Sequence, residues 1–575
     1  MCGLSALISN SDVDTDYINK TIKLLSHRGP DASSFKTITI GGGKTITMCH
    51  TRLKINGNDI PQPITNEAGD IILIINGEIF NWKELSKELN YTCTQSDCEI
   101  IIPLYIKYIR NNDYYDDNIK RFFRKLDGQF SFILFDKKYN TIFISRDHIG
   151  VTPLYYGFNP DLSTIAFASE LKALTPFVST IKVFLPRKYI LAKIDDLTIN
   201  LLNNDDSYLD LYEDITIQSV EPYNIVKQKV NKLLTKSVSK QLDDLLQNNS
   251  PDFGVLLSGG LDSSLIASIV SRLTVEGGRN PRVKTFSIGL PNSVDLLAAR
   301  KVAKFLGTDH HEYTFTVKEG LNAISEVVWY TETYDTTSIR ASTPMYLLIK
   351  KIKKDYPNLK VLFSGELSDE LLCYLYGSNA PSEKDYQLET INLVSNVHLF
   401  DCLRANKTGM ANGVEIRVPF TDREFVEYIL SLPPCYKTFG NIAKMMGKGE
   451  NIIEKKVFRD SFVGYIPDEI LYRKKEQFSD GVSAAFGQNK EENWVESIKN
   501  YCESRYNDLI FNIGIQKYNY NKPSTKEQLY YRNLFCNHFN KNDYNNTSEF
   551  TVKFWKPKWS NSVDPSAREY SSEQF

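Results

Sequence analysis

Cysteine is scarce in this chain, and its scarcity argues against a disulfide-stapled scaffold. Nine cysteines are spread over 575 residues, a low density and an odd number for a disulfide framework. Cys93, Cys98 and the pair His310-His311 could be considered as metal ligands, but none has a partner pair at the spacing of a zinc site. We therefore interpret them as structural residues and expect a reducing compartment.

Long apolar runs and an excess of charge are also missing. No stretch approaches membrane-spanning length, and no basic segment precedes the short apolar run at residues 4–8 as it would in a secretion signal. The formal net charge is only −2, so bulk electrostatics would hold neither a nucleic acid nor an anionic membrane. We expect a cytoplasmic protein that binds neither.

What remains is the composition of a globular protein with more than one core. Hydrophobic residues make up 42% of the chain and charged residues 24%, as in ordinary soluble domains. A chain of 575 residues exceeds what one core usually serves. A polar, loop-like segment separates two periodic regions. We predict domains at 1–200 and 223–545, a linker at 201–222 and a C-terminal tail at 546–575.

One glycine-rich turn has the features of an anion site. An apolar run at 255–257 predicts a buried strand, and the pattern becomes helical after Ser258-Gly259-Gly260. Adjacent glycines allow backbone conformations and a close ligand approach that a Cβ would prevent. The hydroxyls of Ser258, Ser263 and Ser264 surround the N-terminus of the helix, which favours an anion such as pyrophosphate. The Gly-Lys-Ser/Thr ending of a Walker loop is absent. The turn, Ser-Gly-Gly-Leu-Asp-Ser-Ser, resembles the pyrophosphate loop of ATP pyrophosphatases.

The second residue is a cysteine, which suggests another kind of chemistry at the other end of the chain. Removal of the initiator methionine would expose Cys2 with a free α-amino group, whose pKa of about 8 suits a general base. One residue would then supply both the nucleophilic thiol and the base. Taken alone, an incidental buried cysteine is the simpler reading.

Further motifs follow Cys2 in a fixed order. They are His27-Arg28-Gly29-Pro30-Asp31, His50-Thr51-Arg52-Leu53, Asn76-Gly77-Glu78, Ser96-Asp97-Cys98-Glu99, Leu126-Asp127-Gly128-Gln129 and Arg146-Asp147-His148-Ile149-Gly150. Strand patterns lie between them at 71–75, 130–135 and 141–145. This set resembles the class II glutamine amidotransferase domain. The resemblance implies a glutaminase domain at 1–200 with the α+β sandwich (αββα) of N-terminal nucleophile hydrolases.

That resemblance implies roles in glutamine hydrolysis. Cys2 would attack the side-chain amide of glutamine, and Asn76 with the N–H of Gly77 would form the oxyanion hole. Arg52 and Asp97 would bind the α-carboxylate and the α-amine of the substrate.

The resemblance also bears on Glu78, on the pair Asn76-Gly77 and on Thr51. Glu78 would assist with the substrate amine. Asn76-Gly77 is also a common hairpin turn, which is the alternative to an oxyanion hole. Thr51 stands where the family usually has glutamate, and we expect a modest effect of this change.

The second half of the chain alternates strands with helices. Helical patterns at 226–245 and 298–306 flank strand patterns at 255–257 and 284–290, which predicts a parallel sheet with helices on both faces. Ligands of such sheets bind beyond the carboxyl ends of the strands. We therefore expect Ser258, Gly289 and the loop after Phe363 at one crevice.

More motifs complete a second resemblance. They are Thr336-Thr337-Ser338-Ile339-Arg340, Ser364-Gly365-Glu366-Leu367-Ser368-Asp369-Glu370, Asp401-Cys402-Leu403-Arg404, Glu415-Ile416-Arg417-Val418-Pro419 and Lys475-Glu476-Gln477-Phe478-Ser479. With the first half, the chain resembles glutamine-hydrolysing asparagine synthetases to about residue 570. This implies an α/β ATP pyrophosphatase-like synthetase domain at 223–545. It also implies glutamine, aspartate and ATP as substrates, asparagine, glutamate, AMP and pyrophosphate as products, Mg²⁺ as cofactor and a homodimer.

The resemblance implies a second set of site residues. Aspartate would attack ATP, with catalysis mostly by positioning, Mg²⁺ and cations. Asp262 and Asp369 would hold Mg²⁺–pyrophosphate, because Mg²⁺ prefers carboxylate oxygens. Lys475 would neutralise phosphates, and Glu366 would orient the adenylate and the ammonia. The nucleotide would be framed by Leu256, Ser258, Gly259, Gly260, Ser263, Ser264, Ile288, Ser364 and Gly365. The acceptor pocket or ammonia tunnel would include Thr337, Arg340, Asp401 and Arg404, of which the last three could instead form an interdomain salt-bridge network.

Leu367 departs from the family pattern, which has glycine there, and one residue of a Gly-Gly pair is missing near Cys373. Forcing a positive φ on leucine costs about 1–2 kcal/mol. Either the adenylation site is weakened or the loop is rebuilt around the deletion. We hypothesise a rebuilt loop, because Glu366, Ser368 and Asp369 are retained, and Leu367→Gly should then not raise the synthetase rate.

Two other functions stay open at this stage. The acceptor could be a different carboxylate, as in related amidotransferases or β-lactam synthetases, although the latter lack the cysteine found here as Cys2. Alternatively, the chain could be a degenerate, non-catalytic homologue because of Leu367.

Overall fold

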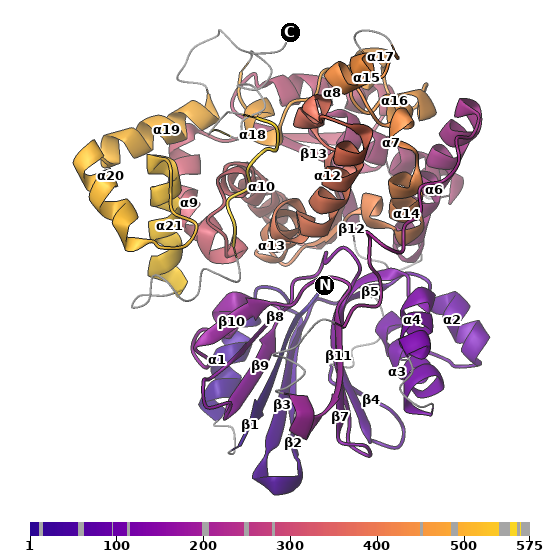
Figure 1. Ribbon diagram of the computed structural model, residues 1–575, viewed down its shortest axis with the longest axis vertical. Coiled ribbons are helices and arrows are strands. Elements are labelled where there is room, and N and C mark those ends of the chain that lie inside the picture. The colour runs from indigo at the N-terminus through magenta and orange to yellow at the C-terminus, as the bar shows by residue number, and fades with distance from the viewer. Residues whose placement is uncertain are drawn as a thin grey trace. The chain divides into compact units, whose positions relative to one another are not determined.

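The computed structural model describes residues 1–10, 15–55, 62–94, 96–111, 116–197, 206–246, 252–278, 282–448, 452–484, 493–539, 552–560 and 564. They belong to two compact units (Figure 1), one of Met1–Asp210 with Met410–Val414 and one of Leu211–Gly409 with Glu415–Phe575. Part of the predicted linker (201–205) and most of the predicted tail lie outside the described residues. In the described part of the chain, no helix has the length and apolar character needed to cross a membrane.

The first unit contains two antiparallel sheets. The first has the order β10-β8-β9-β1-β3-β2 and the second β11-β7-β6-β5-β4. The strands are β1 (Gly3–Ser9), β2 (Ala32–Thr39), β3 (Thr45–Arg52), β4 (Ile64–Thr65), β5 (Ile71–Ile79), β6 (Gly128–Asp136), β7 (Thr141–Arg146), β8 (Tyr155–Phe158), β9 (Thr164–Ala168), β10 (Thr180–Val183) and β11 (Tyr189–Lys193). The predicted strands at 71–75, 130–135 and 141–145 are confirmed within β5, β6 and β7.

Alternation along β5 explains why the sheets stack. Ile72 and Ile74 belong to a hydrophobic core that contains side chains from both sheets, whereas Ile71, Leu73 and Ile75 belong to a second core. Successive residues of a strand point to opposite faces, so β5 contributes to both cores. The first core therefore lies between the sheets, and the second lies on the outer face of the five-stranded sheet.

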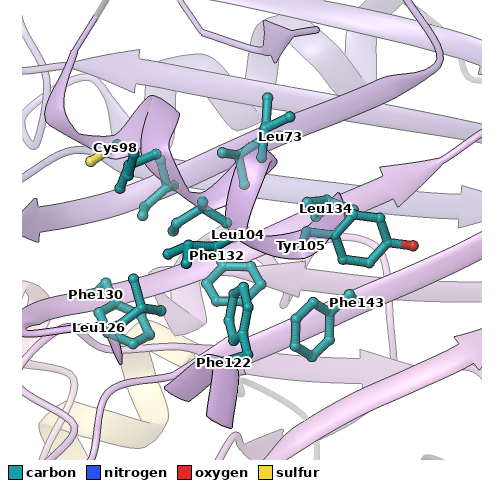
Figure 2. Close-up of a cluster of buried hydrophobic side chains, with 14 of the residues drawn as sticks. Leu73, Cys98, Leu104, Tyr105, Phe122, Leu126, Phe130, Phe132, Leu134 and Phe143 are labelled. Carbon is teal, nitrogen blue, oxygen red and sulfur yellow. The ribbon is translucent and has the colours of Figure 1, made fainter. Parts of the chain in front are cut away.

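Helices cover this outer face. The second core includes side chains from α2 (Trp82–Leu89), α3 (Ile101–Tyr105) and α4 (Asp116–Lys125), while α1 (Thr15–Leu25) packs on β1 and β3. Figure 2 shows Phe122 of α4 against Phe132 and Phe143 of the sheet, with ring centroids 6.3 and 5.3 Å away. Helices outside two stacked sheets confirm the predicted αββα sandwich.

The second unit is built on one parallel sheet of order β14-β13-β12-β15-β16. Its strands are β12 (Asp252–Leu256), β13 (Lys284–Gly289), β14 (Asp309–Thr314), β15 (Leu359–Phe363) and β16 (Glu415–Arg417). The chain proceeds outward from β12 in one direction and returns to β15 on its other side. The carboxyl ends of β12 and β15 therefore form a switch point, where α/β sheets bind ligands.

Helices follow the strands as the α/β prediction requires, with α7 packed against β12 and with α8 and α10 against β13. The helices of this unit are α6 (Tyr223–Leu242), α7 (Leu261–Glu276), α8 (Val294–Leu306), α9 (Val317–Thr331), α10 (Thr336–Asp355), α11 (Ser368–Leu371), α12 (Glu383–Asn396), α13 (Asp401–Met410), α14 (Arg423–Ser431), α15 (Gly440–Met445), α16 (Lys456–Ser461), α17 (Asp468–Leu471), α18 (Phe478–Gly481), α19 (Trp494–Arg505), α20 (Asp508–Gly514) and α21 (Lys526–Phe539). The predicted helix at 298–306 begins earlier, because Ser293 caps α8 by accepting a hydrogen bond from the Leu296 N–H.

Candidate active sites

Cys2 lies directly before β1, so the sheet fixes its position. β1 pairs with β3 and β9, and Cys2 is buried. Its backbone N donates a hydrogen bond of 2.7 Å to Oδ1 of Asn76. Its carbonyl oxygen accepts one of 2.9 Å from Nε of Arg28. The backbone of Cys2 is therefore held on both sides by side chains from distant parts of the sequence.

Asn76 has a second polar atom that no described residue satisfies. It lies within β5, completely buried, and its Nδ2 has no hydrogen-bond partner in the described part of the chain. A buried amide donor without a partner is costly unless a ligand supplies an acceptor. Because Asn76 and Gly77 lie inside a strand, the alternative of a hairpin turn is wrong.

Gly77 occupies a place that no other residue fits. Its φ is +150°, and a Cβ added to it would lie 2.0 Å from the carbonyl oxygen of Gln129 on the neighbouring strand β6. The absence of a side chain is therefore required for β5 and β6 to pair beside Asn76.

Arg28 was not assigned a role from the sequence, although its motif was noted. It is completely buried and pairs through Nη1 with Glu170 at 2.9 Å, and Glu170 also contacts Lys172. Burial alone would raise the pKa of Glu170, but Lys172, His27 and Arg28 hold it well below its usual range. This charged group anchors the arginine that holds the Cys2 carbonyl.

The other residues predicted for glutamine binding are buried in the same unit. Arg52, Glu78 and Asp97 are each less than a tenth exposed. Asp97 accepts a hydrogen bond of 2.7 Å from the Ile79 N–H at the end of β5. Thr51, which replaces the usual glutamate, donates to the Leu25 carbonyl at 3.0 Å. The threonine thus joins β3 to α1.

The second candidate site is a pocket of about 400 Å³ in the second unit. Its lining combines the ends of β12, β13 and β15 with later loops. Predicted residues that line it are Leu256, Ser258, Gly260, Asp262, Ser263, Ile288, Thr337, Ser364, Gly365, Glu366, Asp369, Asp401, Arg404 and Lys475. Of the predicted residues, Gly259, Ser264, Gly289 and Arg340 are not among the described residues that line it.

Glycines bring the two loops of the switch point together. Gly259 has φ +78°, and a Cβ there would lie 2.4 Å from the backbone N of Ala299 in α8. A Cβ on Gly365 would lie 2.8 Å from the backbone N of Ser263. The turn after β12 and the loop after β15 therefore contact each other, as expected for one anion site.

Two aspartates and two lysines form a compact group between these loops. Nζ of Lys455 lies 2.7 Å from Oδ2 of Asp262 and 2.7 Å from Oδ1 of Asp369. Nζ of Lys475 lies 2.8 Å from Oδ2 of Asp369 and 3.5 Å from Asp262. Ser368 donates to Asp262 at 2.6 Å. The oppositely charged groups thus alternate around one point of the pocket.

The electrostatics of this group follow from its geometry. Burial disfavours the charge of Asp262, but Lys455 and Lys475 hold the pKa of its carboxyl well below the usual range. Burial likewise disfavours the charge of Lys475, whereas Asp369 and Asp262 raise its pKa well above the usual value. Both shifts favour the charged forms of Asp262 and Lys475.

Lys455 and Asp295 line the pocket but were missed from the sequence. Lys455 stands in the run Glu454-Lys455-Lys456, which looks like a solvated surface. Asp295 lies in α8, pairs with Arg473 at 3.0 Å, and burial raises its pKa to about 6. Only the fold brings them to the pocket, and no local pattern distinguishes them.

A second charged group lies in the same pocket around Arg404. Its guanidinium contacts Glu366 at 2.7 Å and Asp401 at 2.5 Å. Burial raises the pKa of Glu366, although Arg404 opposes this effect. Burial and the neighbouring Asp401 raise the pKa of Glu370 well above its usual range. The group therefore holds more carboxyls than cations.

Thr337 and Arg340 lie one turn apart on α10 but differ in surroundings. Oγ1 of Thr337 is buried, lines the pocket and has no partner among the described residues. Arg340 is buried in ion pairs with Glu527 at 2.6 Å and Asp564 at 2.8 Å. Arg340 and both of its partners belong to the second unit, so these ion pairs form a network within that unit and not the interdomain network given as the alternative.

The loop after β15 keeps the strained backbone that its sequence suggested. Leu367 has φ +78°, and Cys373 and Tyr374 have φ +62° and +44°. The hypothesis of a rebuilt loop is therefore wrong at Leu367, which adopts the conformation that glycine favours. Asp369 nevertheless reaches both lysines, so the strain coexists with an assembled site.

Comparisons with known proteins agree with this division of the chain. Residues 1–194 match the family described as glutamine amidotransferase domain, and residues 229–389 and 376–560 match the family described as asparagine synthase. Among solved structures, a glutamine phosphoribosylpyrophosphate amidotransferase from B. subtilis covers 55% of this chain and 91% of its own, with 14% identity and a TM-score of 0.30. A likeness this weak adds nothing to the assignment.

Curated relatives match along the whole chain. A probable glutamine-hydrolysing asparagine synthetase of Schizosaccharomyces pombe is 40% identical over 99% of this chain and 98% of its own. Asparagine synthetase 1 of Saccharomyces cerevisiae is 38% identical with the same coverage, and that of Zea mays is 37% identical over 100% of this chain and 94% of its own. At this identity and coverage, together with the two sites described above, the chain belongs to the family of glutamine-hydrolysing asparagine synthetases.

Proposed function

We propose that the chain makes asparagine from aspartate and ATP with nitrogen taken from glutamine, and releases glutamate, AMP and pyrophosphate. The observation that carries the proposal is the presence of two different sites in one chain. One holds Cys2 against Asn76, and the other holds two lysines against two aspartates at a glycine-rich turn. The first site suits amide hydrolysis, and the second suits the release of a polyphosphate.

At the first site, removal of Met1 converts the backbone N of Cys2 into an α-amine. This amine takes the thiol proton while Sγ attacks the side-chain carbon of glutamine. Nδ2 of Asn76, which is buried without a partner, donates to the oxyanion. Ammonia leaves, and water then releases glutamate. Arg52 and Asp97 bind the charged ends of the amino acid, with Glu78 beside its amine.

At the second site, the β-carboxylate of aspartate attacks the α-phosphorus of ATP, which yields β-aspartyl-AMP and pyrophosphate. Lys455 and Lys475, which face the aspartates in this structure, neutralise the charge of the departing pyrophosphate. The hydroxyls of Ser258 and Ser263, 3.0 Å apart, and the N-terminus of α7 bind its oxygens.

Mg²⁺ fits this site as a companion of the nucleotide. Among the described residues there is no cluster of three or more potential metal ligands, so the protein offers Asp262 and Asp369 rather than a complete cage. Two carboxylates combined with phosphate oxygens and water are the usual surroundings of Mg²⁺. When bound, the ion would offset the negative charge of the phosphates.

Glu366 is placed for the last step, in which ammonia attacks the acyl carbon and AMP leaves. Its carboxyl lies 2.7 Å from Arg404 and lines the pocket. Burial raises its pKa, which makes it a better proton acceptor for the attacking ammonia. Thr337 offers an unpartnered hydroxyl to the aspartate.

The substitution Cys2→Ala tests the division of labour. It should abolish glutamine hydrolysis and leave asparagine formation from added ammonia within about twofold, because Cys2 would contribute only to the first reaction. Both products can be measured by amino-acid analysis. Loss of both activities at once would contradict the assignment of Cys2 to glutaminase alone.

Ammonia supplied directly also tests the acceptor. Aspartate-dependent pyrophosphate release without asparagine would indicate another product, and absence of any adenylation would favour a non-catalytic homologue. The predicted domain boundaries, a cytoplasmic location and a homodimer remain part of the proposal. Sedimentation of the purified chain measures the last.

A further inference from the structure

Residues 552–560 and 564, here called the C-terminal strap, contribute to the pocket. Lys553, Phe554, Trp555 and Lys556 line it beside the residues discussed above. These residues fall within the C-terminal tail that the sequence predicts at 546–575. The strap belongs to the second unit, as the pocket does.

The strap is attached to α10 and to the turn that precedes it. The Trp555 N–H donates a hydrogen bond of 2.6 Å to Oδ1 of Asp335. The other carboxylate oxygen of Asp335 caps α10 by accepting from the Ser338 N–H at 2.8 Å. Asp564 pairs with Arg340 of the same helix at 2.8 Å. The strap therefore contacts residues on either side of Thr337, which lines the pocket.

The strap also packs against the strained segment that follows Asp369. The indole of Trp555 lies 6.2 Å from the ring of Tyr374 and 5.6 Å from that of Tyr376. Tyr374 and its neighbour Cys373 both have positive φ. Such conformations cost about 1–3 kcal/mol each and persist only when surrounding contacts enforce them. Trp555 supplies one of these contacts from a distant part of the sequence.

We propose that Trp555 is a positioning residue of the synthetase reaction, holding the strained segment after Asp369 with its indole and the cap of α10 with its backbone. The proposal rests on the proposed function. Trp555 acts through its neighbours: the loop that carries Asp369 and Glu370, and the helix that carries Thr337. It is not assigned contact with a reacting atom.

A matched residue separates positioning from general packing. Trp559 packs against the same apolar cluster as Trp555, which includes Cys373 and Tyr376. Trp559 is not among the described residues that line the pocket. Loss of either indole removes a similar apolar surface from this cluster. The indole of Trp555 lies against the rings of Tyr374 and Tyr376, whereas its backbone hydrogen bond to Asp335 is kept in every variant.

The experiment compares Trp555→Ala, Trp555→Phe and Trp559→Ala in the full chain. It measures aspartate-dependent pyrophosphate release with ammonia as nitrogen donor, and glutamine hydrolysis as the internal control. We expect Trp555→Ala to lower kcat/KM for aspartate by about tenfold or more, because a displaced loop weakens transition-state contacts. Trp555→Phe should restore most of the rate, since a phenyl ring can still pack on both tyrosines. Trp559→Ala and all glutamine hydrolysis should stay within about twofold of wild type.

Four outcomes would count against these proposals. Equal losses in Trp555→Ala and Trp559→Ala would overturn the proposal, as would a Trp555→Phe variant no better than Trp555→Ala. If Trp555→Ala fails to fold, Trp555→Leu replaces it, because leucine is apolar but has no ring to pack on the tyrosines; equal rates for Leu and Phe would then overturn the proposal. A wild-type chain that folds and hydrolyses glutamine but releases no pyrophosphate would instead contradict the proposed function.

Discussion

Leu367 carries two opposing contributions to stability. Its φ of +78° costs about 1–2 kcal/mol for a leucine, whereas truncation of a buried leucine costs about 2–5 kcal/mol. Its side chain is buried, so Leu367→Gly should lower the free energy of unfolding by about 1–3 kcal/mol. Because Asp369 already reaches both lysines with Leu367 in place, the substitution should not raise the rate of asparagine formation. Urea denaturation of the folded enzyme measures the first effect.

Leu371 provides the control for this prediction. It is also buried, and it lies in α11 with no positive φ, so Leu371→Ala removes packing without relieving strain. We expect Leu371→Ala to be the more destabilising of the two. A gain in stability for Leu367→Gly would show that backbone strain outweighs burial.

Lys437 makes the stability of the second unit depend on pH. It is buried, donates to Gln387 at 2.7 Å and to the Ile429 carbonyl at 3.1 Å, and burial lowers its pKa to about 7. An unfolded lysine has a pKa of about 10.4. Between these values the unfolded chain binds the additional proton, so this residue's contribution to stability rises as pH increases.

Lys437→Met should remove this contribution. Between pH 7 and 9, the urea midpoint of wild type should rise relative to that of Lys437→Met, since methionine cannot titrate. Lys448→Met is a useful comparison, because Lys448 is only partly buried and burial lowers its pKa in the same direction. Parallel curves for wild type and Lys437→Met would contradict the assignment of a lowered pKa.

Single residues show where sequence reasoning succeeds and where it stops. Asn76 and Lys475 stand in recognisable motifs, so a resemblance identified them. Lys455 contacts the same two aspartates as Lys475, yet it comes from an ordinary charged run and has φ +57°. Its position depends on packing that brings residues 193 positions apart into contact, which no local pattern encodes.

At the scale of elements, the turn between β12 and α7 depends on one glycine. Gly259 combines φ +78° with a crowded position against α8, where a Cβ would lie 2.4 Å from the backbone N of Ala299. Gly259→Ala should therefore destabilise the chain by more than the roughly 1–2 kcal/mol of a left-handed alanine. It should also lower ATP-dependent activity, because the turn must move.

Gly278 separates the cost of a left-handed backbone from the cost of crowding an added Cβ. It has a similar φ of +73° but nothing within 4 Å of an added Cβ. Gly278→Ala should lose only the backbone term, about 1 kcal/mol, and keep ATP-dependent activity. Equal loss of stability and activity in the two variants would show that crowding against α8 is unimportant.

The elements themselves were largely predictable, and their ends were not. A run of apolar, mostly β-branched residues predicts the strand at 71–75, but β5 continues to Ile79 through Asn76-Gly77, a pair that also suits a turn. Pairing with β6 along nine residues decides between them. Tertiary hydrogen bonds thus override a local preference at the residues that matter most for the first site.

At the scale of the whole molecule, the sequence indicated two domains but not the contacts that attach the C-terminal segment to the rest of the second one. Arg340 pairs with Asp564, 224 residues later, and Trp555 contacts Asp335 and Tyr374. The C-terminal segment has little periodicity, so its part in the pocket could not be predicted. Such contacts depend on the folded sheet, and the segment that makes them comes last in the sequence.

A final prediction follows from the unit to which the residues of each site belong. Every residue assigned to glutamine hydrolysis belongs to the first unit, and every residue that lines the pocket belongs to the second. Asp369→Asn keeps the shape of the side chain but removes the charge that faces Lys455 and Lys475. Pyrophosphate release should fall by about a hundredfold, as when a charged partner of a transition state is lost.

Glutamine hydrolysis in the same variant should stay within about twofold of wild type, so the enzyme should form glutamate without asparagine. Asp385→Asn, at a half-buried position in the first turn of α12 and not among the described residues that line the pocket, is the matched control and should keep both activities. Measuring glutamate and pyrophosphate in one reaction separates the two sites directly. A proportional fall of both products in Asp369→Asn would show that the glutaminase requires an intact second site, because no residue of the first unit was changed.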